Sequence, residues 1–217
     1  MESSHFPLPD QRRYEYAYAL AYKLAAEELN HCDVRKLCSR SGARYLEENA
    51  QRAIVLTYLN RPYQVTLPDV DITLVGSQEV VPMREKILIL HYLTLARGTP
   101  TTGRVITFKE LPEGPVYFPT FAKRTVDPLL DHFGKEPYRL LDTARKLGGH
   151  RSDYGDLAVT INAFPSVAIT LVLWQGDTEF VPSASIIFDA SITDYLSTED
   201  ITVLCETVIW KLVKSLA

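Results

Sequence analysis

The sequence predicts an α+β protein in which a mixed, mainly antiparallel sheet, or more than one such sheet, packs against several helices. Residues 12–29 place apolar side chains at helical spacing, and residues 157–174 alternate apolar and polar side chains as the two strands of a β-hairpin do. Residues 197–212 return to helical spacing after a start with the capping-box pattern. We therefore expect a C-terminal hairpin plus one further strand, followed by a terminal helix.

Length and composition favour a single globular unit. The 217 residues lie within the size range of one large domain, and 46% hydrophobic residues supply enough apolar material for a core. We expect one domain over residues 1–217, with residues 1–10 as a flexible N-terminus. Those ten residues lack the basic start and apolar run of a secretory signal. The longest apolar stretch, Leu157–Trp174, is interrupted by Asn162 and Pro165, so no membrane span is predicted and a cytoplasmic location is expected.

Charge is distributed unevenly along the chain. Residues 151–217 carry nine acidic and three basic side chains, whereas residues 1–150 carry eighteen acidic and twenty basic ones. The C-terminal part would repel phosphates, and the small basic surplus before it is too diffuse for a nucleic-acid footprint. Nucleic acid is therefore not expected as a partner.

The N-terminal half alternates between helical and extended patterns. After the first helix, Asp33 is placed to cap a short second helix that Gly42 ends, and residues 53–75 predict three short antiparallel strands. Residues 83–97 are apolar on nearly all sides, which predicts a buried central helix packed on the sheet.

The second half begins with a short strand over residues 105–108 and a proline-rich loop. Two helices follow, over residues 126–133 and 137–147, and each is stopped by glycine. Strands are then predicted over residues 157–162, from Val167 to Trp174 after a turn at Phe164-Pro165-Ser166, and over residues 185–188.

Local sequence motifs give little support to any particular chemistry. The dinucleotide-binding, P-loop, nucleophile-elbow, zincin and EF-hand patterns are all missing. Cys32, Cys38 and Cys205 are odd in number and fit neither a redox pair nor a zinc site, so we expect reduced thiols. His91 lies in an apolar run, where a core histidine bonded to a backbone carbonyl is favoured over a metal ligand.

Glycine, aromatic and acidic residues gather in three segments of the C-terminal third. Because the start of one hairpin strand lies near the end of the other, Asp156 and residues 174–177 should share a sheet edge, and Asp189 joins them if the third strand pairs alongside. The glycines would allow close backbone approach to a ligand, and the aromatic rings would supply flat walls. The predicted binding residues are Gly148, Gly149, His150, Tyr154, Asp156, Trp174, Gly176, Asp177, Glu179 and Asp189.

A structural interpretation of the same residues stays open. Gly-Asp pairs form turns, aspartates cap local N–H groups, and Trp174 would fill the core. A catalytic pair of Asp177 and Glu179 is not the favoured interpretation. His150 is either an exposed loop residue or an axial ligand.

Several segments together resemble a prokaryotic family, found mostly in anaerobes, that is catalogued only as a domain of unknown function. The resemblance covers most of residues 40–205. It is carried by the stretch from Lys86–Leu93 through Phe108, and by Leu147–Gly149, Tyr154–Asp156, Phe164-Pro165, Leu173–Asp177, Glu179-Phe180, Ile187–Asp189, Tyr195-Leu196 and Glu199-Asp200.

The resemblance implies a shared site and the company of cofactors. Some members carry an added four-cysteine iron–sulfur module and lie among genes of corrinoid-dependent methyl transfer. This chain lacks that module, so an electron-carrying role would need a separate protein. The residues implied to form the shared site are Gly149, Tyr154, Asp156, Trp174, Asp177, Glu179 and Asp189.

Three functional hypotheses follow. The first is a cofactor- or ligand-binding accessory protein of anaerobic metabolism that holds a planar tetrapyrrole, such as a corrinoid or haem, with His150 as axial ligand and a redox or methyltransferase protein as partner. The second is a small enzyme that uses Asp156, Asp177 or Glu179 as general base or divalent-metal ligand. The third is a non-catalytic interaction module whose tyrosine-rich first helix and acidic C-terminal edge contact a basic or aromatic partner.

Overall fold

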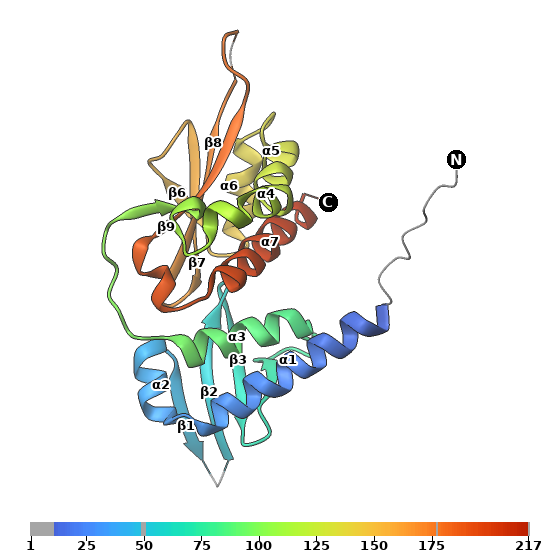
Figure 1. The fold of residues 1–217 in the computed structure, drawn as a ribbon, viewed down its shortest axis with the longest axis vertical. Coiled ribbons are helices and arrows are strands. Elements are labelled where there is room, and N and C mark those ends of the chain that lie inside the picture. The colour runs from blue at the N-terminus through green and yellow to red at the C-terminus, as the bar shows by residue number, and fades with distance from the viewer. Residues whose placement is uncertain (1–10, 49–50, 177, 217) are drawn as a thin grey trace.

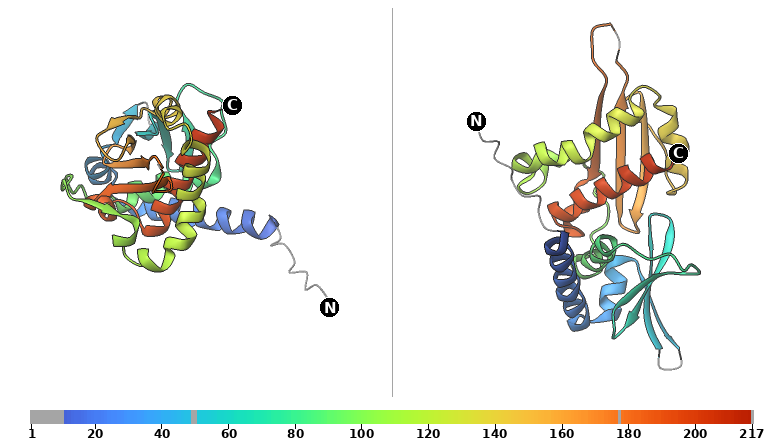
Figure 2. Two further views of the ribbon diagram at one scale, coloured as in Figure 1. Left: turned by 90° about the horizontal axis from the view of Figure 1, so that it is seen from above. Right: turned by 90° about the vertical axis from the view of Figure 1, so that its right-hand side faces the viewer.

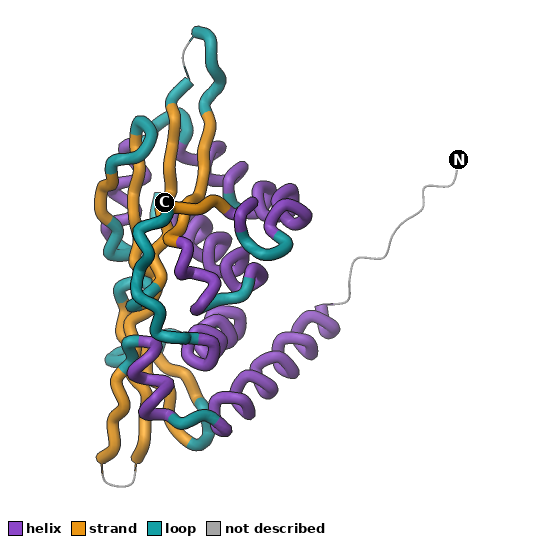
Figure 3. Tube along the Cα trace, turned by 60° about the vertical axis from the view of Figure 1, so that its left-hand side comes forward, coloured by secondary structure: helices purple, strands orange, loops and turns teal. Residues whose placement is uncertain are grey.

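The computed structural model describes residues 11–48, 51–176 and 178–216 and confirms the α+β class (Figure 1). Two antiparallel sheets lie end to end, and most helices lie on one side of the strands (Figure 3). The predicted flexible N-terminus falls outside the described residues. In the part of the chain that the structure describes, no helix has both the length and the apolar character needed to cross a bilayer.

The N-terminal half forms the four-stranded sheet, in the order β1-β2-β3-β4. Its elements are α1 (Gln11–His31), α2 (Val34–Ser41), β1 (Arg44–Glu48), β2 (Gln51–Tyr58), β3 (Arg61–Leu67), β4 (Asp71–Leu74) and α3 (Met83–Leu95). Asp33 caps α2 by accepting from the Arg35 and Lys36 N–H groups, and Gly42 ends it with a φ of 68°, as predicted. β1 was not predicted because it is exposed along almost its whole length and has no apolar alternation.

The C-terminal half forms the five-stranded sheet, in the order β5-β9-β8-β7-β6. Its strands are β5 (Val105–Thr107), β6 (His150–Ser152), β7 (Leu157–Phe164), β8 (Val167–Trp174) and β9 (Ser183–Asp189). Its helices are η1 (Phe108–Glu110), α4 (Gly114–Arg124), α5 (Val126–Phe133), α6 (Tyr138–Arg145), η2 (Ala190–Asp194) and α7 (Thr198–Lys214). The predicted hairpin, further strand and terminal helix are confirmed.

Helix α4 corrects the prediction of a proline-rich loop. Pro115 lies in the first turn, where a missing N–H group has no consequence, whereas Pro119 lies inside the helix. The helix forms nevertheless because Phe121 is buried and stacks on Phe108, with ring centroids 3.8 Å apart. Tertiary packing thus overrides the local signal of the two prolines.

A stack of buried aromatic rings joins the two sheets. Phe164 of β7 stacks on Tyr58 of β2 at 4.8 Å and on Tyr92 of α3 at 4.1 Å between ring centroids. Beside it, the Leu59 N–H group donates to the Ala163 carbonyl across the junction at 2.9 Å. The buried residues of both sheets belong to one contiguous cluster. That the sheets fold together as one domain stays a prediction.

Polar contacts between α3 and α7 also cross this junction. The Lys211 ammonium lies 2.9 Å from the Glu85 carboxylate, and Arg84 pairs with Glu206. The prediction for His91 is wrong: its side chain is 34% exposed, and Nδ1 lies 2.7 Å from the Asp200 carboxylate instead of a backbone carbonyl. The reason is that α7 packs against α3, which brings the first turn of α7 against His91. The Asp200 hydrogen bond raises the pKa of His91 above its ordinary value.

Candidate functional site

The candidate site lies at the end of the five-stranded sheet where the β6–β7 and β8–β9 loops meet. We call the residues Tyr154, Asp156, 174–176 and 178–183 the hairpin end. The Asp156 carboxylate accepts from the Gln175 N–H group at 2.7 Å, and the Asp156 N–H group donates to the Leu173 carbonyl at 3.0 Å. The predicted proximity of Asp156 to the end of β8 is confirmed. In the right panel of Figure 2, the β8–β9 hairpin extends beyond the helices.

Gly155 lets the β6–β7 loop lie directly on the sheet. It has a φ of +54°, and a Cβ atom there would lie 2.7 Å from Val172 Cγ1 and 3.3 Å from the Trp174 ring. A larger residue would be strained and would also push the loop off the strand. The loop therefore supports one side of the Trp174 ring.

The hairpin end exposes several large apolar side chains together. Tyr154 is 43% exposed, Trp174 40%, Phe180 69% and Val181 85%, so the interpretation that Trp174 fills the core is wrong. Trp174, Phe180 and Val181 border an open hollow of about 450 Å³. It is lined by Asp156, Trp174, Gln175, Phe180, Val181 and Ser183.

The remaining predicted residues of these loops have different roles. Gly176 lies against Pro182, where an added Cβ would lie 2.5 Å from the proline ring. This glycine therefore lets the two arms of the β8–β9 loop lie close together. Glu179 lies in the same β8–β9 loop. Asp177 lies outside the described residues.

Gly148 and Gly149 lie elsewhere and serve helix α6. The Gly149 N–H group donates to the Ala144 carbonyl at 2.8 Å and the Gly148 N–H group to the Arg145 carbonyl at 3.0 Å, which is the Schellman arrangement that ends a helix. Gly148 has a φ of +74° and lies against the Asn60 side chain, at the junction of the two sheets. The prediction that these glycines join the hairpin end is therefore not met.

His150 is also separated from Trp174. It is not in a loop but is the first residue of the edge strand β6, where it pairs with Thr160, which in turn pairs with Thr170. Trp174 lies four residues beyond Thr170, about 13 Å along the strand. His150 therefore does not line the hollow.

Asp189 lies at the opposite end of the sheet, so its expected place beside Asp156 is wrong. β9 runs antiparallel to β8 with Ser183 opposite Trp174, and Asp189 follows about 20 Å further along the strand. There its carboxylate accepts hydrogen bonds of 2.7–3.0 Å from the N–H groups of Thr102, Gly103 and Ser191 and from the hydroxyls of Thr102 and Ser191.

These bonds hold Asp189 in its ionised form. Partial burial raises the pKa of Asp189, but the hydrogen bonds from Ser191 and Thr102 outweigh that effect and hold it far below its ordinary value. The carboxylate fastens the segment before β5 to the end of β9. Its role in the described structure is to fix that segment.

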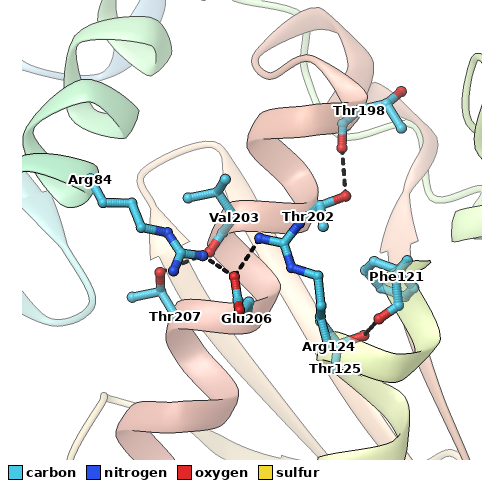
Figure 4. Close-up of polar contacts among 9 residues, drawn as sticks. All are labelled: Arg84, Phe121, Arg124, Thr125, Thr198, Thr202, Val203, Glu206 and Thr207. Atoms are coloured by element: carbon cyan, nitrogen blue, oxygen red, sulfur yellow. Dashed lines mark hydrogen bonds and ion pairs between the residues drawn. The ribbon is translucent and has the colours of Figure 1, made fainter. Parts of the chain in front are cut away.

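Sequence reasoning missed a cluster formed by three helices. Glu206 of α7 lies between the guanidinium groups of Arg84 from α3 and Arg124 from α4 (Figure 4). Burial raises the pKa of Glu206, but its hydrogen bonds to Arg124 and Arg84 outweigh this and lower it. Because the three residues are far apart in the sequence and follow no motif spacing, no local pattern could have revealed them.

A cleft of about 270 Å³ opens beside Arg124. It is lined by Glu113, Tyr117, Thr120, Phe121, Arg124, Thr198, Glu199 and Thr202. Among the described residues, no three His, Cys, Asp or Glu side chains are close enough to hold a metal ion. The three cysteines are free, as expected, and burial raises the pKa of Cys38 to about 11.

Replacement of Asp189 tests its structural role. We expect Asp189→Asn to lower the free energy of unfolding by about 1–3 kcal/mol. The N–H groups of Thr102, Gly103 and Ser191 would then face a neutral amide instead of an ionised carboxylate. Asp153→Asn, on the exposed β6–β7 loop, should change it by less than about 0.5 kcal/mol.

The pH dependence gives a second readout by chemical denaturation. The Asp189 pKa is depressed in the folded protein, so its stabilisation is present above the unfolded-state pKa of about 4 and is lost as the pH falls toward the folded-state pKa. The difference between wild type and Asp189→Asn should therefore stay constant from about pH 7 to 5 and shrink below about pH 4. Equal stability of the two proteins at neutral pH would contradict this role.

Comparison with known proteins places the chain in a family. No curated protein and no solved structure matches it. A family model described as "Domain of unknown function (DUF3786)" matches residues 33–211, which span both sheets and all of the hairpin end. The chain therefore belongs to the DUF3786 family, whose function is unknown.

Proposed function

We propose that this protein is a non-catalytic binding protein and that the hairpin end takes a partner protein through an apolar segment flanked by basic side chains. The observation that carries the proposal is the grouping of exposed Trp174, Phe180 and Val181 around one hollow. Contiguous exposed apolar surface of this kind is typical of interaction sites.

The binding surface at the hairpin end is preorganised by contacts within the chain. The Asp156 hydrogen bond to Gln175 ties the β6–β7 loop to the chain after β8, and Gly155 lies against the Trp174 ring. A side chain that is already held in place loses less conformational entropy on binding. Tryptophan is also among the residues that contribute most to interface affinity.

The charge of this region selects the partner. Asp153 and Asp156 lie on the β6–β7 loop and Glu179 on the β8–β9 loop, within the C-terminal part that carries nine acidic and three basic residues. Lysine or arginine beside the apolar segment would match these carboxylates and speed association. The open form of the hollow suits a side chain offered by a larger partner better than a fully enclosed ligand.

Selection from a random-peptide display library tests this function. We expect enriched peptides to carry an aromatic or aliphatic residue next to lysine or arginine. Trp174→Ala or Phe180→Ser should weaken their binding at least about tenfold, measured by fluorescence polarisation, because each removes a central aromatic contact. Trp210→Ala is the matched control, since Trp210 is similarly exposed (42%) but lies on α7. Failure to enrich any peptide, or equal binding by all three variants, would overturn the proposal.

A planar tetrapyrrole, such as a corrinoid or haem, is the second candidate. The observation that favours it is the pair of aromatic rings, Trp174 and Phe180, that line the hollow. The position of His150 about 13 Å along the strand from Trp174 means that ring stacking, and not this imidazole, would hold the ligand.

Titration with haemin and with hydroxocobalamin, followed by absorption, tests this candidate. Trp174→Ala should weaken binding at least about tenfold, because it removes one of the two rings that stack on the ligand. Binding by Trp210→Ala and His150→Ala should equal that of wild type. An unchanged spectrum with the wild-type protein, or binding that depends on His150 and not on Trp174, would contradict it.

A further inference from the structure

Strand β9 is paired along only part of one edge. β5 pairs with Ile187–Asp189, and the chain then leaves the sheet to form η1. Residues 183–186 pair with β8 on their other side, but in the described structure no strand lies beside them on the β5 side. We call residues 183–186 on that side the open edge. Such an edge is a ready template for pairing with another chain.

The open edge presents the backbone groups of Ala184 and Ile186. In an antiparallel strand the N–H and C=O groups of one residue point to the same side, and the side alternates along the chain. The Ala190 N–H group donates to the Arg104 carbonyl at 2.8 Å, so the backbone groups of Phe188, Ile186 and Ala184 also point toward the β5 side. Those of Phe188 meet β5, whereas no other described residue bonds to those of Ile186 and Ala184 on this side.

A groove of about 250 Å³ lies against the open edge. One wall is formed by residues 184–186, and the other includes Phe118 and Phe121 of α4 and Val126 of α5. The second wall is therefore largely apolar. A strand edge beside an apolar groove is the arrangement that strand addition uses, in which main-chain hydrogen bonds give affinity and side-chain pockets give specificity.

The two ends of the open edge differ in charge. Among the described residues that line the groove, Lys109 is the charged one, and its Nζ atom lies 4.2 Å from the centroid of the Phe118 ring. At the other end, Ser183 lines the hollow of the hairpin end together with Asp156. A segment that lies along the edge would therefore meet a positive charge at one end and a negative charge at the other.

We propose that the partner segment binds in an extended conformation, as an additional strand along the open edge of β9. Its backbone pairs with Ala184 and Ile186, and alternate side chains enter the groove. This inference rests on the proposed function, because the same segment continues into the hollow beside Trp174. The open edge is about 13 Å long, so a segment of about six residues covers it and reaches the hollow.

The direction of the added strand follows from the rest of the sheet. All of its strand pairs are antiparallel, and antiparallel ladders are slightly more stable per residue than parallel ones. A strand antiparallel to β9 runs as β5 does, from Lys109 toward the hairpin end. We therefore expect an acidic residue toward the N-terminus of the segment, apolar residues in the middle, and lysine or arginine toward the C-terminus.

N-methylation of single peptide amides tests the added strand. The tightest-binding peptide from the display selection is synthesised in versions that each carry one N-methyl group. Binding to the full wild-type chain is measured by fluorescence polarisation. Methyl groups on alternate amides, those that face β9, should weaken binding at least about tenfold, because each removes a donor and separates the two backbones. Methyl groups on the intervening amides should change it less than about twofold.

This experiment separates the two proposals. If the peptide depends on Trp174 but its affinity shows no alternation along the N-methyl series, strand addition is wrong and the proposed function stands. If no peptide is enriched at all, both are overturned.

Variants of the open edge give a second test with the same peptide. Ala184→Pro removes an N–H group that faces the groove but none that bonds to β8, which is where a strand tolerates proline. It should weaken binding at least about fivefold, whereas Ala184→Ser, which keeps the N–H group, should bind as wild type does. Both should keep the wild-type circular dichroism spectrum. Equal binding by the two variants would contradict the added strand.

Charge reversal at Lys109 tests the direction. Lys109→Glu should weaken binding of the peptide at least about threefold, because its N-terminal acid would then face a like charge. Lys135→Glu is the matched control, since Lys135 is also exposed but does not line the groove. Enriched peptides with the acid toward the C-terminus, or equal binding by both variants, would show that the antiparallel placement is wrong.

Discussion

The structure depends on the stacking of Phe164 between Tyr58 and Tyr92. These rings come from the five-stranded sheet, the four-stranded sheet and helix α3. The Tyr92 hydroxyl donates to the Ser41 carbonyl at 2.6 Å and accepts from the Ser166 N–H group at 3.3 Å, so its polar atom is satisfied inside the core. Two sheets that would otherwise end in loops thereby share one apolar interior.

This junction determines where binding surfaces can form. Because the sheets meet end to end, their outer ends lie away from the junction (Figure 1). The hairpin end lies at the far end of the five-stranded sheet.

The sequence predicted what depends on local pattern. Helix α1, the cap at Asp33 and the β7–β8 hairpin were recognised from spacing, and the hairpin register placed Asp156 beside the end of β8. Helix α4 was missed because its formation depends on the distant contact between Phe121 and Phe108. The strands β1 and β6 were missed because edge strands with exposed side chains have no apolar alternation to detect.

The predicted site was only partly correct, for a geometric reason. Consecutive antiparallel strands run in opposite directions, so acids at the ends of successive strands alternate between the two edges of the sheet. Asp156 therefore lies beside Gln175 at one end of the strands, and Asp189 lies at the opposite end, where it holds the segment before β5. The glycines at 148 and 149 were correctly seen as conformationally special, but a helix end accounts for them and a ligand is not needed.

The central claim is that the aromatic junction makes the two sheets one cooperative unit. Hydrogen–deuterium exchange of Phe164→Ala, compared with wild type, tests it most directly. The substitution should cost about 3–5 kcal/mol of unfolding free energy, as truncation of a buried phenylalanine does. If the claim is correct, amides of β2 and β3 lose protection together with those of β7 and β8. Loss of protection in the five-stranded sheet alone would show that the sheets fold independently.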